Sequence, residues 1–314
     1  MGTPLLWIGF NLFVLASIAL DLGVFNRRLH KVSLREAGFF SLLWVVLSIL
    51  FGLGVLRYSG KQAGLEFFTG YLIEKALSVD NLFLFLVIFR TFAVDERFQH
   101  RMLEWGILGA LVMRGVMILA GAELIERFSW VLYVFGAFIV YASIHMLFVK
   151  KEKVRPEQSV IFRLANKHLR ITRDYKGERF FVRSSGKLFA TPLFLVLLVV
   201  EVTDITLAID SIPAIFGITQ DPFIVYTSNV FAILGLRAMY FLLAGVLSRL
   251  RFLTVGLSFV LTFIGAKMIA HKWVDIPEHI SLMIVGGILL LALAASLLFP
   301  AKTAATTRRT SATG

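Results

Sequence analysis

The chain has 314 residues, of which 58% are hydrophobic and only 17% charged, and its mean hydropathy is +0.82. Soluble domains are about half apolar and about a quarter charged, so this composition excludes a soluble globular protein and a disordered one, and it indicates a polytopic membrane protein. Cysteine is absent, which excludes disulfides, thiolate metal sites and a cysteine nucleophile.

Nine stretches are apolar enough to cross the hydrocarbon of a bilayer, which takes about 20 helical residues each. They are residues 4–25, 37–56, 64–89, 103–122, 129–149, 190–216, 223–247, 252–270 and 280–299. The strands of a membrane β-barrel would instead alternate over about ten residues, so we expect an all-α helix bundle. No Lys or Arg precedes Arg27, so the first stretch lacks the basic start of a signal peptide and is expected to stay in the mature chain.

Basic residues are distributed unevenly between these spans. Of the 32 Lys and Arg residues, 24 lie in the odd-numbered loops and the C-terminal tail, four lie in the even-numbered loops and four lie inside spans. The positive-inside rule therefore predicts a cytoplasmic C-terminus and an N-terminus outside. Topology then explains the net charge of +12 without a nucleic-acid partner, although the 150–189 loop, with twelve bases, could also bind anionic lipid or RNA.

Two parts of the chain repeat one pattern of polar residues. Residues 74–81 read EKALSVDN and residues 204–211 read DITLAIDS, so an acid is followed six positions later by a second acid and a small polar residue. Arg114 and Arg237 then match in the spans that follow. Each unit has three spans, so the second copy enters the membrane from the opposite side, as in the inverted repeats of secondary transporters. Chance similarity between apolar helices is the alternative.

The repeat predicts how the chain is organised. We expect two N-terminal spans in 1–63, the first three-helix repeat in 64–149, a basic cytoplasmic loop in 150–189, the inverted second repeat in 190–271, a last span in 272–300 and a disordered cytoplasmic tail in 301–314.

Carboxylates lie in the middle of the third and sixth spans. A charged side chain at this depth is costly, so these groups should face the bundle interior and pair, protonate or bind a cation. The candidate metal ligands are Glu74, Asp80, Asn81, Asp204, Asp210 and Ser211, supported by Glu201 and Asn229. The alternative is internal ion pairing with the four basic residues inside spans, which are Lys75, Arg114, Arg237 and Lys267.

Helix geometry constrains how these acids can meet. Residues six apart lie about 120° apart around a straight helix, so the two acids of one motif share an ion only if the helix is distorted, or each acid meets its counterpart in the other repeat. Pro213 offers a distortion, because it cannot donate to the carbonyl of Ile209; a simple kink is the alternative. Asp21 and Glu66, near span ends, are candidate gating residues, although an interfacial position explains them equally.

The donor set indicates the type of ion. Cysteine is absent and His145 is the only histidine inside a predicted span, so the ligands on offer are oxygens. Oxygen-rich sites suit magnesium, calcium or manganese rather than copper or zinc, and several carboxylates favour a divalent cation over sodium.

Several long stretches carry a resemblance to a known family. They are 66–83 (EFFTGYLIEKALSVDNLF), 99–111 (QHRMLEWGILGAL), 133–138 (YVFGAF), 201–216 (EVTDITLAIDSIPAIF) and 228–237 (SNVFAILGLR). These motifs resemble those of the TerC/Alx family of integral membrane proteins, and the similarity covers nearly the whole chain except the tail. The resemblance implies export of manganese(II) across the bacterial inner membrane, with Glu74, Asp80, Asp204 and Asp210 as the acidic motif residues.

Three functions compete on the sequence. The first is a secondary transporter that exports divalent metal ions, most directly manganese, by alternating access. The second is a non-transporting membrane scaffold in metal or tellurite stress, which would gather partners through the 150–189 loop. The third, an intramembrane aspartyl hydrolase, is disfavoured because the acids lie in duplicated motifs without a Gly-Asp setting. We therefore expect a transporter with no enzymatic activity and no permanently bound cofactor.

Overall fold

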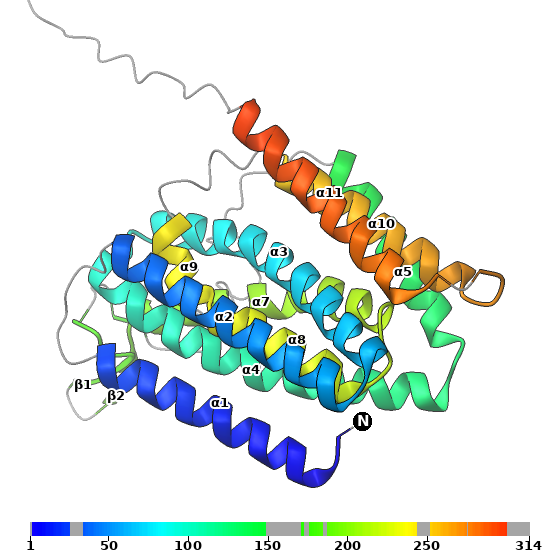
Figure 1. Ribbon diagram of the computed structural model, residues 1–314. Coiled ribbons are helices and arrows are strands. Elements are labelled where there is room, and N and C mark those ends of the chain that lie inside the picture. The colour runs from blue at the N-terminus through cyan, green and yellow to red at the C-terminus, as the bar shows by residue number, and fades with distance from the viewer. Residues whose placement is uncertain are drawn as a thin grey trace, which may run out of the picture.

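A computed structural model describes residues 2–25, 34–148, 171–172, 176–184, 187–243, 252–274 and 276–299. Helices dominate this part of the chain, accompanied by one two-stranded sheet (Figure 1), so the all-α prediction is confirmed. The helices are α1 (Pro4–Phe25), α2 (Leu34–Tyr58), α3 (Lys61–Thr91), α4 (Glu96–Arg127), α5 (Val131–Phe148), α7 (Pro192–Phe216), α8 (Pro222–Leu234), α9 (Leu236–Leu243), α10 (Leu253–Ala270) and α11 (Glu278–Leu298), and the strands are β1 (Phe181–Ser184) and β2 (Lys187–Ala190).

Each of the nine predicted spans coincides with helix. Within the described residues, seven segments are long and apolar enough to cross a membrane; of the 22-residue helix α1, only Pro4–Ala19 has described side chains, and this part is apolar. The helix α3 matches the predicted span 64–89 and has 31 residues, which is long enough to cross a membrane. It is not among the seven because Glu74, Lys75 and Asp80 make its middle too polar. The predicted tail 301–314 and residues 150–170, 173–175 and 185–186 of the predicted loop lie outside the described residues.

Helix starts follow ordinary capping chemistry. Asp221 precedes Pro222 and accepts hydrogen bonds from the backbone N–H groups of Phe223 (2.9 Å) and Ile224 (3.4 Å). A side-chain cap of this kind satisfies N–H groups that have no partner within the helix, and proline fits the first turn because it lacks an N–H. Asp95 likewise caps α4 by accepting from the N–H of Arg97 at 3.0 Å.

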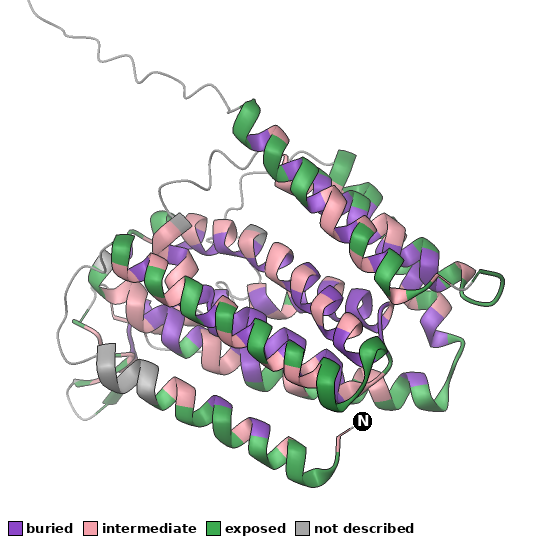
Figure 2. Cartoon of the chain, viewed as in Figure 1, coloured by how far each residue is buried: buried purple, intermediate pink, exposed green. Residues whose placement is uncertain are grey.

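Helices from the two predicted repeats pack on one another. The helix α3 lies against α8, α4 against α7, and α5 against α10. In α8, every residue from Phe223 to Leu234 except Tyr226 is buried, so this helix is enclosed on all sides. Figure 2 shows exposed residues along α1 and α2 and buried ones on the inner helices. The bundle centre therefore lies between α3, α4, α7 and α8.

The predicted loop 150–189 contains a structure that the sequence reasoning missed. Strands β1 and β2 form an antiparallel hairpin in which Phe181 pairs with Ala190. Glu178, just before the hairpin, forms a 3.1 Å ion pair with Arg101 of α4, and the Phe180 ring packs edge-on against Trp105, with centroids 6.1 Å apart. The hairpin is thus attached to the start of α4.

Within the described residues, one predicted span is interrupted at a place that the sequence did not predict. The predicted span 223–247 is divided at Gly235 into α8 and α9, and residues 244–251 lie outside the described part. The distortion expected at Pro213 is no break, because α7 continues as helix through this proline to Phe216.

Two glycines bring α5 and α10 into close contact. A Cβ on Gly265 would lie 2.8 Å from the carbonyl oxygen of Gly136 and 2.7 Å from Cγ2 of Val140. The backbone cannot yield without separating the helices, so we expect Gly265→Ala to cost about 1–3 kcal/mol of stability. Thermal unfolding of the purified protein should show a lowered midpoint.

The matched control is Gly287→Ala in α11, where an added Cβ would meet nothing within 4 Å. Alanine favours helix over glycine, so this midpoint should stay or rise. Equal losses in the two variants would contradict the close approach.

Candidate functional site

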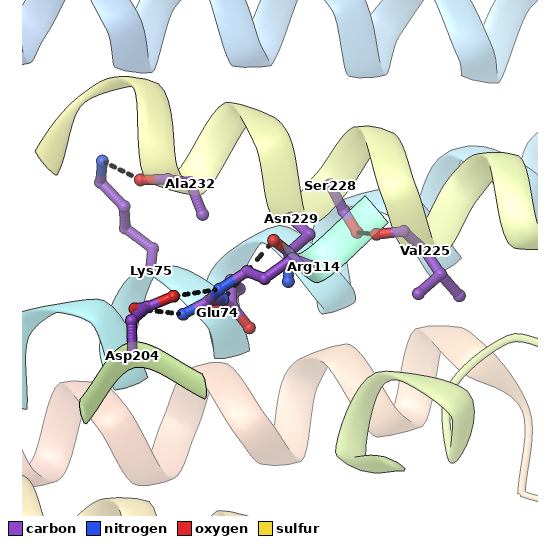
Figure 3. Close-up of polar contacts among 8 residues, drawn as sticks. All are labelled: Glu74, Lys75, Arg114, Asp204, Val225, Ser228, Asn229 and Ala232. Carbon is purple, nitrogen blue, oxygen red and sulfur yellow. Dashed lines mark hydrogen bonds and ion pairs between the residues drawn. The ribbon is translucent and has the colours of Figure 1, made fainter. Parts of the chain in front are cut away.

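A buried arginine joins three helices at the centre of the bundle. Arg114 of α4 is only 1% exposed. Its Nε and Nη2 donate to the two carboxylate oxygens of Asp204 in α7, each at 3.2 Å, which is a bidentate ion pair. Its Nη1 donates to Oε1 of Glu74 in α3 and lies 3.5 Å from Oδ1 of Asn229 in α8 (Figure 3). The first acids of the two repeated motifs therefore meet at one guanidinium.

The charges in this cluster do not balance. Glu74 is 0% exposed and Asp204 is 4% exposed, so neither carboxylate is solvated by bulk water. With both ionised, two negative charges face the single positive charge of Arg114. Excess charge in a buried site is costly unless a proton or a cation compensates it.

Four buried polar atoms near this level have no hydrogen-bond partner among the described residues. They are Glu74 Oε2, Ser78 Oγ, Ser211 Oγ and Asn229 Nδ2. Each such atom costs about 1–3 kcal/mol when nothing satisfies it. Three of these atoms are oxygens that can bind a cation, whereas Asn229 Nδ2 is an amide donor.

The register between α3 and α7 places Ser211 in the same region. Thr219, just after α7, donates to Oε2 of Glu66 at 2.6 Å, and a Cβ on Gly70 would lie 3.4 Å from Ile215. Both contacts fit one antiparallel register, in which each step forward along α3 is a step back along α7. One turn further, this register puts Glu74 opposite Ser211.

The predicted set of six metal ligands is brought together only in part. Within the described residues no group of three or more Asp, Glu or His side chains gathers as a metal site would require. Asn81 is buried but is not among the hydrogen-bond partners of Arg114, whereas Asp210 is half-exposed and makes no hydrogen bond or ion pair with any described residue. Asp210 is six residues from Asp204, which turns it toward another side of α7.

Two predicted residues have side chains outside the described part. Asp80 lies within α3 and Asp21 within α1, and only their place in these helices is described.

Two further predicted acids lie on the helices that form the central cluster, Glu201 close to Asp204 and Glu66 nearer the start of α3. Glu201 precedes Asp204 by about one turn of α7, and its half-buried carboxylate packs on Gly109 of α4, where an added Cβ would overlap it. Glu66 accepts from Thr219 and, at 3.0 Å, from Gln62, so this predicted gating residue ties α3 to the segment after α7.

Internal ion pairing, the alternative interpretation, applies to three of the four intramembrane bases. Besides Arg114, Arg237 donates to Oε1 of Glu104 at 3.0 Å, and Lys267 donates to Oε1 of Glu278 at 2.5 Å. Neither Glu104 nor Glu278 was a candidate, because both lie next to predicted span ends, where a charge needs no partner.

Lys75 behaves differently from the other bases. Its Nζ donates to the carbonyl oxygen of Ala232 at 3.3 Å, and it forms no ion pair with a carboxylate whose side chain is described.

Comparison with known proteins identifies a family for most of the chain. Residues 59–307 match the model of the Integral membrane protein TerC family. An "Uncharacterized membrane protein STKORF319" of Myxococcus xanthus is 48% identical over 298 residues, which cover 95% of this chain and 93% of that protein. The "Putative membrane-bound redox modulator Alx" of Escherichia coli strain K12 is 47% identical over 300 residues, covering 93% and 94% of the two chains. No solved structure matches.

Proposed function

The chain belongs to the TerC family of integral membrane proteins, and we propose that it is a secondary transporter that exports divalent cations, with manganese(II) as substrate, across a bacterial inner membrane. Manganese and the outward direction rest on the resemblance of the motifs around Glu74 and Asp204. The name of the Escherichia coli relative speaks of redox modulation. This chain has no cysteine, so thiol–disulfide exchange cannot be its contribution to such a role.

The meeting of Glu74 and Asp204 at Arg114 is the observation that carries the proposal. In the absence of metal, the guanidinium compensates part of the charge of both carboxylates. A divalent cation entering between them would replace Arg114 as the counter-ion and gain the oxygens of Glu74 and Asp204. Hard divalent cations bind carboxylate and hydroxyl oxygens well, and Ser211 offers such a hydroxyl.

Helix packing supports an inverted repeat. The partners α3–α8 and α7–α4 exchange with one another when the two predicted repeats are interchanged, while α5–α10 maps onto itself. The antiparallel register of α3 and α7 is also the one expected of corresponding helices in units of opposite orientation. Two such units moving around the Arg114 cluster would open it to either side in turn. With the N-terminus outside and the C-terminus in the cytoplasm, the basic 150–189 region would lie on the cytoplasmic side.

Replacing Glu74 with glutamine should reduce manganese transport about tenfold or more. The change removes one charged ligand, an interaction worth about 1.5–3 kcal/mol, while Arg114 and Asp204 remain as a balanced pair. Proteoliposomes containing a manganese-quenched dye report the flux directly.

The matched control is Glu123→Gln in the same set of helices, because Glu123 forms an exposed pair with Arg127. Undiminished flux in Glu74→Gln and Asp204→Asn would refute the proposed site. The scaffold function makes the opposite prediction: shortening the 150–189 region would abolish metal tolerance of cells, and the two acid variants would leave it intact.

A further inference from the structure

Lys75 is a partly buried cation next to the central cluster that takes no part in it. Lys75 follows Glu74 directly in α3, yet Figure 3 shows its side chain reaching away from Arg114 toward Ala232. Ala232 belongs to the last turn of α8, and a Cβ on Gly235 would lie 2.8 Å from Nζ of Lys75. The ammonium thus lies at the interruption between α8 and α9.

This interruption is a place where a cation is electrostatically favoured. The last carbonyls of a helix lack partners within it, and together they resemble about half a negative charge. Residues from Phe231 to Arg237 are buried, so the carbonyl end of α8 is enclosed by protein. The Tyr71 ring, whose centroid is 6.0 Å from Nζ, adds a weaker attraction for a cation.

Discontinuous helices of secondary transporters use such carbonyl ends to coordinate a sodium ion or a proton. Here the carbonyl of Ala232 is already bonded to an ammonium that belongs to the chain. A Cβ on Gly235 would lie 2.8 Å from Nζ, so a larger residue at this position would displace the ammonium from its present place.

We propose that the break between α8 and α9 is a monovalent-cation site that the Lys75 ammonium fills permanently. The site itself follows from the geometry at Ala232 and Gly235; its consequence for transport rests on the proposed function. The consequence is that metal export needs no sodium or potassium ion, because the chain supplies the cation that stabilises the broken helix. Removing the side chain should leave a vacancy that takes a small monovalent cation.

The site is tested without transport by thermal unfolding of purified Lys75→Ala. Methylammonium, sodium or potassium chloride is compared with choline chloride at equal ionic strength. We expect a saturable rise of about 2–4 °C with methylammonium or one of the small cations, as for a ligand present at about ten times its Kd. Wild-type protein and Lys61→Ala, which removes an exposed lysine of the same helix, should show no such rise.

Lys75→Met separates charge from volume. Methionine fills the space without a charge, so this variant should be less stable than wild type and insensitive to methylammonium. If Lys75→Ala is recovered only with a small cation present, the site is supported. If Lys75→Ala responds like Lys61→Ala, or is lost in every salt while Lys75→Met is as stable as wild type, the site is overturned.

Transport provides the second readout. Manganese flux of the wild type should be equal in sodium, potassium and choline, whereas flux of Lys75→Ala should rise at least threefold on addition of methylammonium or sodium. A sodium requirement in the wild type would overturn the filled site and leave manganese transport standing. Absence of manganese flux in the wild type would refute the proposed function while the thermal shift of Lys75→Ala still decides the site.

Discussion

Arg114→Met should be among the most destabilising substitutions in the bundle. It would leave Glu74 and Asp204, which are 0% and 4% exposed, without their common cation. Removing one partner of a buried ion pair costs about 3–5 kcal/mol, because the remaining charge stays desolvated. The measurement is the thermal midpoint in detergent together with the yield of folded protein. Arg114→Lys should lose less stability because it keeps the positive charge, although lysine cannot form the two parallel hydrogen bonds to Asp204.

Neutralising the two acids provides the control. In a triple variant with Glu74→Gln and Asp204→Asn, the buried negative charges disappear, so stability should recover in large part. If the triple variant is no more stable than Arg114→Met, lost packing rather than charge explains the effect. Under the proposed function, manganese should also raise the midpoint of Arg114→Met more than that of the wild type, because both carboxylates become free ligands.

Arg237→Met should be nearly as damaging, by about 3–5 kcal/mol, because it breaks a second buried pair. Arg237 and Glu104 are 7% and 8% exposed, and their contact joins α9 to α4 at 3.0 Å. Nδ1 of His100 lies 3.0 Å from the same carboxylate oxygen. Urea or thermal unfolding of the purified variants gives the comparison.

Arg127→Met in α4 is the matched control. Its pair with Glu123 is solvent-exposed, with the two side chains 70% and 58% accessible. Exposed pairs contribute about 0–1 kcal/mol, so this variant should unfold close to wild type. Similar losses for Arg237→Met and Arg127→Met would show that burial of the Glu104 pair has little energetic weight.

The helices were predictable because the apolar stretches are long and continuous. The position of Glu74, Asp204 and Arg114 inside predicted spans indicated that they face the bundle interior, since a charge in the middle of a membrane needs a partner. All three are buried. Acids six residues apart point to different sides of a helix, which left two possibilities. Either the helix is distorted, or corresponding acids of the two repeats meet. The contact of both acids with Arg114 corresponds to the second possibility.

Other features depend on contacts that the sequence does not encode locally. Glycine is common within membrane helices, so Gly235 alone does not predict a helix break. The break lies next to the side chain of Lys75, which is 160 positions earlier in the chain. Glu104 lies near the end of a predicted span, where a charge is ordinary. Its pairing with Arg237, 133 residues later, depends on the tertiary structure. The hairpin at Phe181–Ala190 was not predicted, because the composition of this region is typical of a basic loop.

The order of synthesis fixes the order in which the charges of the Arg114 cluster are made. Glu74 precedes Arg114 by 40 residues, whereas Asp204 follows it by 90. At about 5–20 residues per second, the nascent chain therefore holds Glu74 and Arg114 in the bilayer for on the order of ten seconds before Asp204 is made. Those two residues can neutralise each other during insertion, and the late acid then adds the negative charge that distinguishes the finished protein from its intermediate.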